Sequence, residues 1–417
     1  MKSGCGMRDN ANCQVGGNMP TNIASAEPRQ FDVIVLGAWA AGLLCAATAG
    51  QRGRRVALLE HGGQPGRKIL ISGGGRCNFT NLHCGPENFL SENPHFAKSA
   101  LAGFEPRHFI DLVDRYGIRW HEKTLGQLFC DGSARAIVQM LLTECQVGGV
   151  EIVLNSGGIK VERDAASGFR VTSSQGEFRA ESLVVATGGL SIPKLGATGL
   201  GYELASQFGL KIAEPRPALV PLVLGGDEAG WTRLAGLSAE VVANAGKAAF
   251  REKLLVTHRG LSGPAILQAS SYWRPGMELV LDFAPSAQTS LLEALLEPGA
   301  RRDLPALKQA LRQVLPQRLA DYLAEIGKPQ GWSNPAITAR ERELRAWRLH
   351  PLGTEGFAKA EVTAGGVDTT GLLARTLEAR AVPGLFFVGE VVDVTGQLGG
   401  HNFQWAWSSG VAVGRAC

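Results

Sequence analysis

Residues 31–42 read FDVIVLGAWAAG, an apolar run that passes directly into a glycine-containing turn. The run at 33–36 predicts a buried strand, a helix is expected from about Ala40, and VALLE at 56–60 predicts the next strand. This order is typical of the first βαβ unit of a doubly wound sheet, whose turn has the pattern G-x-G-x-x-G. The three glycine positions of that pattern hold Gly37, Trp39 and Gly42. The chain therefore carries a dinucleotide-binding fingerprint with a tryptophan at its second glycine.

The acid that follows the fingerprint indicates which dinucleotide fits. Glu60 lies roughly 20 residues after Gly37, where an acid hydrogen-bonds the adenosine ribose and selects against a 2′-phosphate. FAD or NAD is therefore favoured over NADP. The Trp39 indole fills the space through which the pyrophosphate usually touches the backbone. Either the loop turns this indole aside or the phosphates sit differently, and a strand, turn and helix without a nucleotide is the alternative.

An uncharged stretch at 33–50 has the length of a transmembrane helix. Its strand-like start, its glycines and the arginines that follow at 52, 54 and 55 fit a buried strand and helix better. We therefore expect no membrane association.

Composition narrows the class of protein. The 417 residues, 45% of them hydrophobic, are enough for two or three domains. A net charge of +4, with no basic run interleaved with aromatic residues, argues against nucleic acid as a partner. The eight cysteines show neither C-x-x-C nor zinc spacing, and no secretory segment precedes them, so we expect reduced thiols, a cytoplasmic protein and no metal site. The polar residues 1–30 are predicted to be disordered, with Met19 as an alternative start.

The remaining chain divides by its hydrophobic patterns. Helical periodicity marks 106–116 and 133–145, and alternating stretches at 151–154, 159–162, 169–172 and 177–180 predict a meander of strands. Residues 183–189 and 385–390 predict two more buried parallel strands. We expect an α/β protein with a discontinuous nucleotide-binding domain at 31–210 and 350–417, a β-rich domain at 211–286 and about 345–365, and a helical subdomain at 287–344.

Three further glycine clusters carry candidate chemistry. In GRKILISGGGRCNFTN at 66–81, consecutive glycines expose backbone amides that suit an anion, and a flexible surface loop is the alternative. In VVATGG at 184–189, the chain leaves a strand close to a planar ring, or makes an ordinary strand exit. At 382–407, a strand delivers Gly389 and Glu390, and Gly400 opens a helix whose free amides suit an electron-rich oxygen.

Six ordered motifs together resemble a known family. They are VIVLGAWAAG, GRKILISGGGRCNFTN, VVATGG with GATGLGY, THRGLSGPAIL, GTEGFAKAEVTAGGV and GEVVDVTGQLGGHNFQWA, and they extend over nearly all of 31–417. The chain resembles the bacterial FAD-dependent flavoproteins that include aminoacetone oxidase and the BaiN-type bile-acid reductase. This resemblance implies a glutathione-reductase-type FAD-binding Rossmann domain, interrupted by an inserted β-barrel domain and a small helical subdomain.

The resemblance also implies a set of cofactor-binding residues. Glu60 binds the adenosine ribose, Lys68 and the glycine loop line the cofactor, Glu390 bonds the ribityl chain or a phosphate, and the helix after Gly400 stabilises negative charge on the reduced ring. A tyrosine is expected at His401. The implied set is Gly37, Ala38, Ala41, Gly42, Glu60, Lys68, Ser72, Gly73, Gly74, Gly75, Arg76, Cys77, Asn78, Thr187, Gly188, Gly389, Glu390, Gly400, Asn402 and Phe403.

Three side chains are catalytic candidates. His401 stands beside the glycines that open the last helix, so it is our first candidate for a titrating group near the ring. His258, in THRGLSGP, is a second candidate proton donor or a hydrogen-bonded histidine in a turn. Cys77 has no partner cysteine at redox spacing, which favours a structural or substrate-lining thiol over a relay.

We therefore expect an FAD-dependent oxidoreductase that transfers hydride between the flavin and a small organic substrate. It would be an oxidase of an amine such as aminoacetone, or a reductase that takes its electrons from NAD(P)H. The sequence lacks a second dinucleotide fingerprint, so any NAD(P)H would bind transiently. Two alternatives remain: a cofactor-poor binding module whose phosphate site Trp39 blocks, and a flavin-dependent RNA-modifying enzyme. No feature of the sequence indicates a protein partner.

Overall fold

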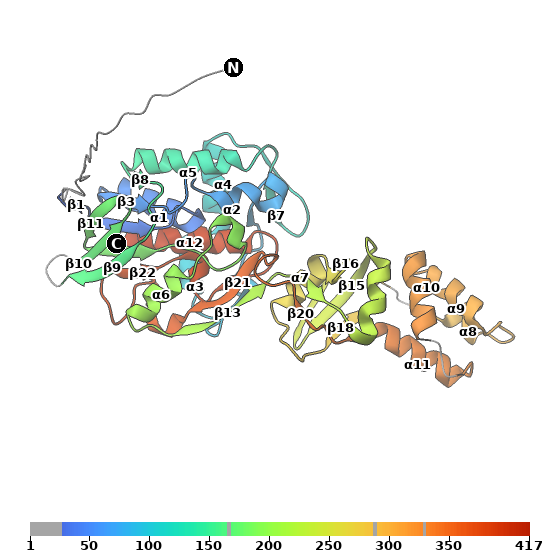
Figure 1. The fold of residues 1–417 in the computed structure, drawn as a ribbon. Coiled ribbons are helices and arrows are strands. Elements are labelled where there is room, and N and C mark those ends of the chain that lie inside the picture. Colours follow the sequence, from blue (N-terminus) through green and yellow to red (C-terminus); the bar gives the residue numbers. More distant parts are fainter. Residues whose placement is uncertain (1–26, 165–167, 287–289, 328–330) are drawn as a thin grey trace, which may run out of the picture.

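The computed structural model describes residues 27–164, 168–286, 290–327 and 331–417. Figure 1 shows one body that contains both the earliest described residues and the C-terminus, and a second body formed by the middle of the chain. Residues 1–26 of the segment predicted to be disordered, Met19 included, lie outside the described residues. The prediction is wrong for the end of that segment, because Arg29–Gln30 form strand β1 and pair with a later strand.

A parallel five-stranded sheet forms the centre of the first body, in the order β22-β12-β2-β3-β8. Helices cover it, so its central strands read as unbroken apolar runs such as VIVL and VALL, fully buried. The strand predicted at 33–36 and the helix predicted from Ala40 are confirmed. The strands are β2 (Val33–Leu36), β3 (Val56–Leu59), β8 (Glu151–Val153), β12 (Ser182–Val185) and β22 (Leu385–Phe387).

The first and last helices of this body pack directly on each other. Helix α1 (Ala40–Gln51) contacts α12 (His401–Ala416) and α5 (Arg135–Val147). Two glycines of α12 allow the close approach, since a Cβ on Gly410 would lie 2.6 Å from the Ala41 carbonyl oxygen and one on Gly414 would lie 2.7 Å from that of Cys45. The other helices here are α2 (Arg67–Ile71), α3 (Lys98–Gly103), α4 (Pro106–Arg115) and α6 (Leu200–Gln207).

Smaller sheets complete this body. The predicted meander forms with one difference: β8 joins the parallel sheet beside β3, and the other three stretches pair antiparallel with one another. The smaller sheets consist of β9 (Lys160–Asp164), β10 (Gly168–Ser173) and β11 (Gly176–Ala180) with β1; β4 (Asn78–Asn81), β6 (Trp120–Glu122) and β7 (Gln127–Cys130); and β5 (Phe89–Leu90) with β23 (Thr395–Gly396).

The second body is built on an antiparallel seven-stranded sheet in the order β19-β18-β15-β16-β17-β14-β20. Within the described residues no pairing joins the outer strands β19 and β20, so the barrel stays a prediction. The two-stranded pair β13 (Ile212–Ala218) and β21 (Val362–Val367) runs from the first body toward this sheet (Figure 1). The strands are β14 (Leu222–Val223), β15 (Ser238–Ala245), β16 (Ala248–Val256), β17 (Gly260–Ser262), β18 (Leu279–Asp282), β19 (Trp347–Leu349) and β20 (Gly353–Thr354).

Helices cover this sheet and continue its core. Trp231, Phe283, Leu307 and Leu323 belong to one buried cluster that extends from the sheet into the helices, so the helical segment shares its core with the sheet. The domain bounds at 211, 287 and 345 remain proposals. The helices are α7 (Pro264–Ser270), α8 (Glu293–Leu296), α9 (Leu304–Arg312), α10 (Gln317–Ile326) and α11 (Asn334–Arg345).

Short 3-10 helices link several elements. They are η1 (Ser72–Gly75), η2 (Pro86–Asn88), η3 (Pro193–Leu195), η4 (Gly226–Leu234), η5 (Thr369–Gly371) and η6 (Gly389–Val391). No helix in the described ranges is long and apolar enough to cross a bilayer, and the uncharged stretch at 33–50 is divided between β2 and α1.

Candidate functional site

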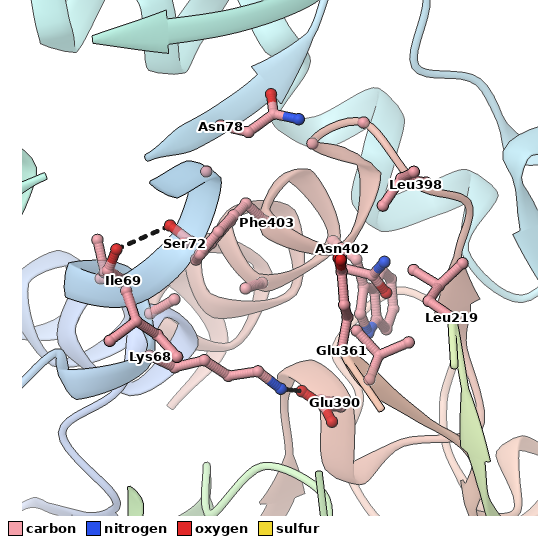
Figure 2. A pocket seen from close by; sticks show the side chains of 18 of the residues that line it. Lys68, Ile69, Ser72, Asn78, Leu219, Glu361, Glu390, Leu398, Asn402 and Phe403 are labelled. Carbon is pink, nitrogen blue, oxygen red and sulfur yellow. Dashed lines mark hydrogen bonds and ion pairs between the residues drawn. The ribbon is translucent and has the colours of Figure 1, made fainter. Parts of the chain in front are cut away.

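A cavity of about 590 Å³ lies where the two bodies meet, within the size range of ligand sites. Figure 2 shows Lys68 and Glu390 meeting on one side of it and Leu219 and Leu398 across from Lys68. Of the residues that we expected to bind a cofactor, the following border the cavity: Ala41, Lys68, Ser72, Gly73, Gly74, Asn78, Gly188, Gly389, Glu390, Gly400, Asn402 and Phe403.

The triple-glycine loop forms one wall because its backbone takes a shape that other residues resist. Gly73, Gly74 and Gly75 all have positive φ, at 55°, 69° and 85°. A Cβ on Gly73 would lie 2.8 Å from the Phe129 ring and 2.9 Å from the Asn78 amide nitrogen. A substitution there would push the loop off β4 and β7, whereas Gly74 faces open space.

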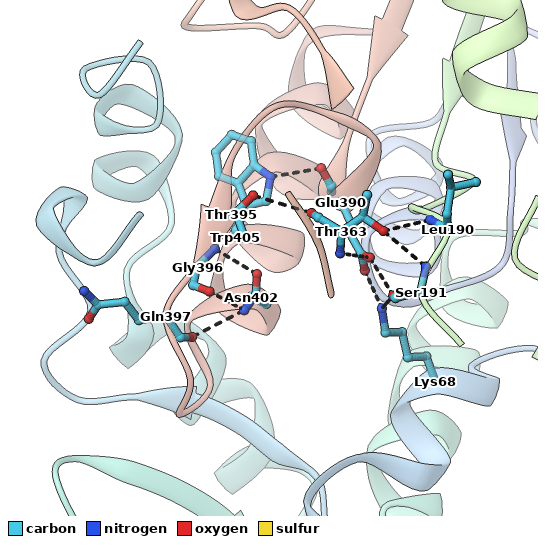
Figure 3. A network of polar contacts seen from close by, with 11 residues as sticks. Lys68, Leu190, Ser191, Thr363, Glu390, Thr395, Gly396, Gln397, Asn402 and Trp405 are labelled. Carbon is cyan, nitrogen blue, oxygen red and sulfur yellow. Dashed lines mark hydrogen bonds and ion pairs between the residues drawn. The ribbon is translucent and has the colours of Figure 1, made fainter. Parts of the chain in front are cut away.

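An ion pair joins α2 to η6 at the cavity wall. Lys68 Nζ lies 2.5 Å from Glu390 Oε2 and donates a 2.7 Å hydrogen bond to Ser191 Oγ. Glu390 Oε1 accepts from Ser191 Oγ at 2.8 Å and from the Thr363 amide at 2.9 Å (Figure 3). Both charged side chains are about one-fifth exposed, at 19%. The network therefore fixes four segments that are far apart in sequence around one carboxylate.

The start of α12 forms another wall. Gly400 has φ 100°, and a Cβ on it would lie 2.4 Å from the Thr80 carbonyl oxygen. Asn402 bonds both the amide and the carbonyl of Gly396 at 2.8 Å, and Trp405 Nε1 donates to the Gly389 carbonyl at 3.0 Å. The first turn of a helix has N–H groups without intrahelical partners and a positive dipole end. This wall therefore suits an oxygen-rich or negatively charged group.

The fingerprint itself is explained by close backbone packing. Gly37 has φ 105°, and a Cβ on Gly42 would lie 1.9 Å from the Gly37 carbonyl oxygen. Trp39 differs, since φ −100° and ψ −168° are extended backbone that any residue adopts. Position 39 therefore does not require a glycine. Trp39 occupies the N-cap position of α1 and borders the cavity.

The remaining expected cofactor residues do not border the cavity. Glu60 is 1% exposed and accepts hydrogen bonds from the amides of Ala38 and Gly62, at 2.9 Å and 2.8 Å. It therefore holds the fingerprint turn in shape. The expected residues outside the cavity lining are Gly37, Ala38, Gly42, Glu60, Gly75, Arg76, Cys77 and Thr187.

None of the three catalytic candidates borders the main cavity. His258 is exposed in the turn between β16 and β17 and does not border the cavity. Cys77 is fully buried outside the lining, and desolvation raises the pKa of its thiol far above the ordinary range, so the thiol stays protonated. His401 is 5% exposed and borders a smaller neighbouring pocket.

Sequence reasoning missed several cavity residues, among them two acids. Glu252 on β16 and Glu361 before β21 both border the cavity, and desolvation raises the pKa of both carboxyls. Nearby Lys68 opposes the shift at Glu361. Glu361 lies in the recognised motif GTEGFAKAEVTAGGV but was not singled out there, whereas Glu252 belongs to no motif and reaches the cavity only through the packing of the second body against the first. The motif THRGLSGPAIL, which was recognised in the sequence, does contribute to the site, because its Pro264 borders the cavity.

His401→Phe should change how stability depends on pH. Burial lowers the pKa of His401 from 6.5 to about 4, so between these values the unfolded chain binds the proton more readily. The wild-type protein should therefore lose stability as pH falls through this window, by up to roughly 1.4 kcal/mol per pH unit from this group. Phenylalanine keeps the edge-on contact with the Phe89 ring and removes the titration. Urea unfolding at pH 7 and pH 5 measures the difference, and equal pH slopes for both proteins would contradict the assignment.

Comparison with known proteins identifies a family and several relatives of this chain. The family model described as HI0933-like protein Rossmann domain matches residues 31–416. A protein of Escherichia coli K12 named ribosomal RNA dihydrouridine synthase is 51% identical over 388 residues, which cover 91% of this chain and 96% of that protein. A protein of the same name from Haemophilus influenzae is 45% identical over 393 residues, with 91% and 96% covered.

A more distant relative has a different name. The 3-dehydro-bile acid delta(4,6)-reductase of Clostridium scindens is 29% identical over 409 residues, which cover 92% of this chain and 98% of that protein. This match supports the broad resemblance to NAD(P)/FAD-dependent oxidoreductases. The finer resemblance to aminoacetone oxidase stays a prediction.

Two expectations from the sequence are wrong. We expected a small organic substrate and no nucleic-acid partner, whereas two relatives that share about half of this chain's residues are named for ribosomal RNA. The small substrate was an expectation from the resemblance, and the exclusion of nucleic acid came from whole-chain charge and the lack of a basic run. A net charge of +4 sums over the entire surface, and nucleic acid responds to the local field at the contact.

Proposed function

Because the chain belongs to the HI0933-like Rossmann-domain family, we propose that it is a flavoprotein that reduces uridine in ribosomal RNA to dihydrouridine. The observation that carries the proposal is the match to two ribosomal RNA dihydrouridine synthases, at 51% and 45% identity. The family match over residues 31–416 includes the cavity walls from both bodies, and the alignments to the two synthases cover 91% of this chain. Of the two alternatives that the sequence left open, these matches favour the flavin-dependent RNA-modifying enzyme.

The cavity residues fit FAD as the cofactor. Gly188 has φ 72° and faces open space, so the chain passes the cavity there without a side chain. Gly389 has φ 71°, and a Cβ on it would lie 2.9 Å from Ala41 Cβ. In this proposal Gly188, Gly389 and the residues Ser72, Gly73 and Gly74 would hold the cofactor, and the free amides in the first turn of α12 would stabilise negative charge on it. Bound FAD, when reduced, supplies the hydride that saturation of the uracil C5–C6 double bond needs.

The protein supplies position and a proton. Reduction of the double bond adds a hydride to one carbon and a proton to the other. Glu361 borders the cavity just before β21 with an exposed side chain, and the raised pKa of its carboxyl lets it keep a proton at higher pH than an ordinary glutamate. The Lys68–Glu390 pair holds α2 against η6, and Leu219 and Pro264 add apolar surface to the lining.

The purified full-length protein should be yellow and should form dihydrouridine. Ribosomal RNA from a strain without this activity is incubated anaerobically with the protein and NADH, NADPH or dithionite, then digested for nucleoside mass spectrometry. We expect dihydrouridine only when both protein and reductant are present, and the NADH and NADPH samples show whether a nicotinamide serves as donor. A colourless protein that takes up no FAD contradicts the cofactor. A flavoprotein that yields no dihydrouridine with any of the three reductants contradicts the RNA activity.

A further inference from the structure

A second pocket, of about 160 Å³, adjoins the main cavity. Gln127, Glu252, Gln397 and Leu398 border both spaces, so the two are neighbours with a shared wall. The larger space carries the backbone features suited to a cofactor. The smaller one is lined almost entirely by amide, imidazole and carboxyl side chains, and nothing in the proposed cofactor site requires it.

Some polar groups of this pocket already have partners and others do not. Asn81 bonds the Leu125 and Gly399 carbonyls and the His83 amide, and Asn88 bonds the Gly85 amide and Gln397. By contrast, the Gln127 side chain makes no hydrogen bond within the described part of the chain. Glu252 has one long contact there, 3.5 Å from Gln268 Nε2. Two polar side chains at the shared wall are therefore free to meet a ligand.

His401 brings a third polar side chain to this pocket. It is 5% exposed and borders the pocket, and its side chain makes no hydrogen bond within the described part of the chain. Its buried Nδ1 has almost no accessible surface, so the rest of the ring is what a ligand in the pocket can meet. Burial lowers the pKa of His401 to about 4, and a neutral imidazole at pH 7 offers one donor and one acceptor. A neutral, polar ligand matches that chemistry.

We propose that this pocket, defined by Gln127, Glu252 and His401, receives the hydrogen-bonding edge of a uracil base whose ring lies in the main cavity. The proposal rests on the proposed function, because it supplies the base that the reaction needs. An enzyme that acts on a base in RNA must unstack it and read its Watson–Crick edge in a pocket. That edge of uracil presents two carbonyl oxygens on either side of the N3–H donor.

The three side chains complement this pattern. A carboxyl oxygen of Glu252 accepts from N3–H, the Gln127 amide donates to one carbonyl, and the His401 imidazole donates to the other. Cytosine presents an acceptor at N3, which opposes the Glu252 carboxylate, whereas the Gln127 amide and the neutral His401 ring can each offer a donor or an acceptor, so Glu252 carries the discrimination. The pocket therefore selects uracil over cytosine, and each lost contact leaves a buried polar group unpaired.

The test uses His401→Phe and Glu252→Met in the full-length flavoprotein, with Glu240→Met as the matched control. Glu240 lies on the adjacent strand β15, is exposed, and pairs with Arg251 away from both pockets. We expect both pocket variants to retain FAD and its rate of reduction by dithionite. Dihydrouridine formation should fall by tenfold or more in each, while Glu240→Met remains within twofold of the wild-type protein.

Thermal unfolding gives a readout that does not depend on turnover. At equal millimolar concentrations, uridine 5′-monophosphate should raise the Tm of the wild-type protein more than cytidine 5′-monophosphate does, because a ligand stabilises by its affinity for the folded state. The pocket variants should lose that difference. No preference in the wild-type protein overturns the proposal, as does full activity in both variants or a loss of FAD from them, which would assign the pocket to the cofactor. A wild-type flavoprotein that makes no dihydrouridine removes the function itself.

Discussion

Gly42→Ala should prevent stable folding and FAD retention. The added Cβ would lie 1.9 Å from the Gly37 carbonyl oxygen, and no side chain can move to relieve the clash. Gly37 is fixed in turn, because its own position faces the Ala186 carbonyl and its amide bonds the Leu59 carbonyl at 2.8 Å. We expect a loss of at least about 4 kcal/mol, a large part of the stability of an ordinary domain. Guanidinium unfolding and the flavin absorbance of the purified protein measure both effects.

Gly103→Ala is the control for this substitution. Gly103 ends helix α3, has ordinary φ, and a Cβ on it meets nothing within 4 Å. Alanine should be neutral or stabilise by up to about 1 kcal/mol there, because it lowers the entropy of the unfolded chain. If Gly42→Ala unfolds within about 1 kcal/mol of the wild-type protein, the helix and strand can separate without cost, and the packing explanation fails.

Glu390→Ala should cause the second largest loss of folding stability. Its carboxylate accepts from Ser191 and the Thr363 amide and pairs with Lys68, and each of these groups would lose its acceptor at a site about four-fifths buried. We expect destabilisation of about 2–3 kcal/mol and a protein purified with little FAD, because η6 and α2 both border the cavity. The unfolding midpoint and the ratio of flavin to protein absorbance report the two losses separately.

Glu325→Ala is the matched comparison. Glu325 pairs with Lys308 at 2.6 Å between α10 and α9, far from the cavity, and its side chain is 59% exposed. Exposed pairs contribute about 1 kcal/mol or less, so FAD content should not change and stability should shift little. Equal losses in the two variants would mean that Glu390 acts as an ordinary surface pair.

The local parts of the fold could be predicted from sequence because their cause is local. The runs VIVL and VALL are apolar at every position, as only strands covered on both faces are, and these became β2 and β3. The glycines of the fingerprint and of the triple-glycine loop were identified for a similar reason, since a positive φ or a close backbone approach requires glycine. Glu151–Val153 was expected in the meander but pairs with β3 in the parallel sheet. The alternation of polar and apolar residues indicates a strand and does not show which distant strand it pairs with.

The site residues that lie within one sequence motif could be predicted, whereas those that reach the cavity through contact between the two bodies could not. Lys68, Glu390 and the start of α12 belong to motifs, whereas Glu252 and Leu219 carry no local signal and reach the cavity through the docking of the second body. His401 shows a finer limit. Successive residues on a helix point about 100° apart, so Asn402 and Phe403 border the main cavity while His401 borders the smaller pocket.

The packing of α1 against α12 also determines when the site can exist during synthesis. Helix α1 leaves the ribosome about 350 residues ahead of its partner, and β22, which completes the parallel sheet beside β12, is also made late. Until then the Ala41 and Cys45 face of α1 and the edge of β12 are uncovered, although the second body, whose core is separate, can already form. The nascent first half is therefore the stage most open to chaperone binding, and FAD can be enclosed only after translation has passed α12.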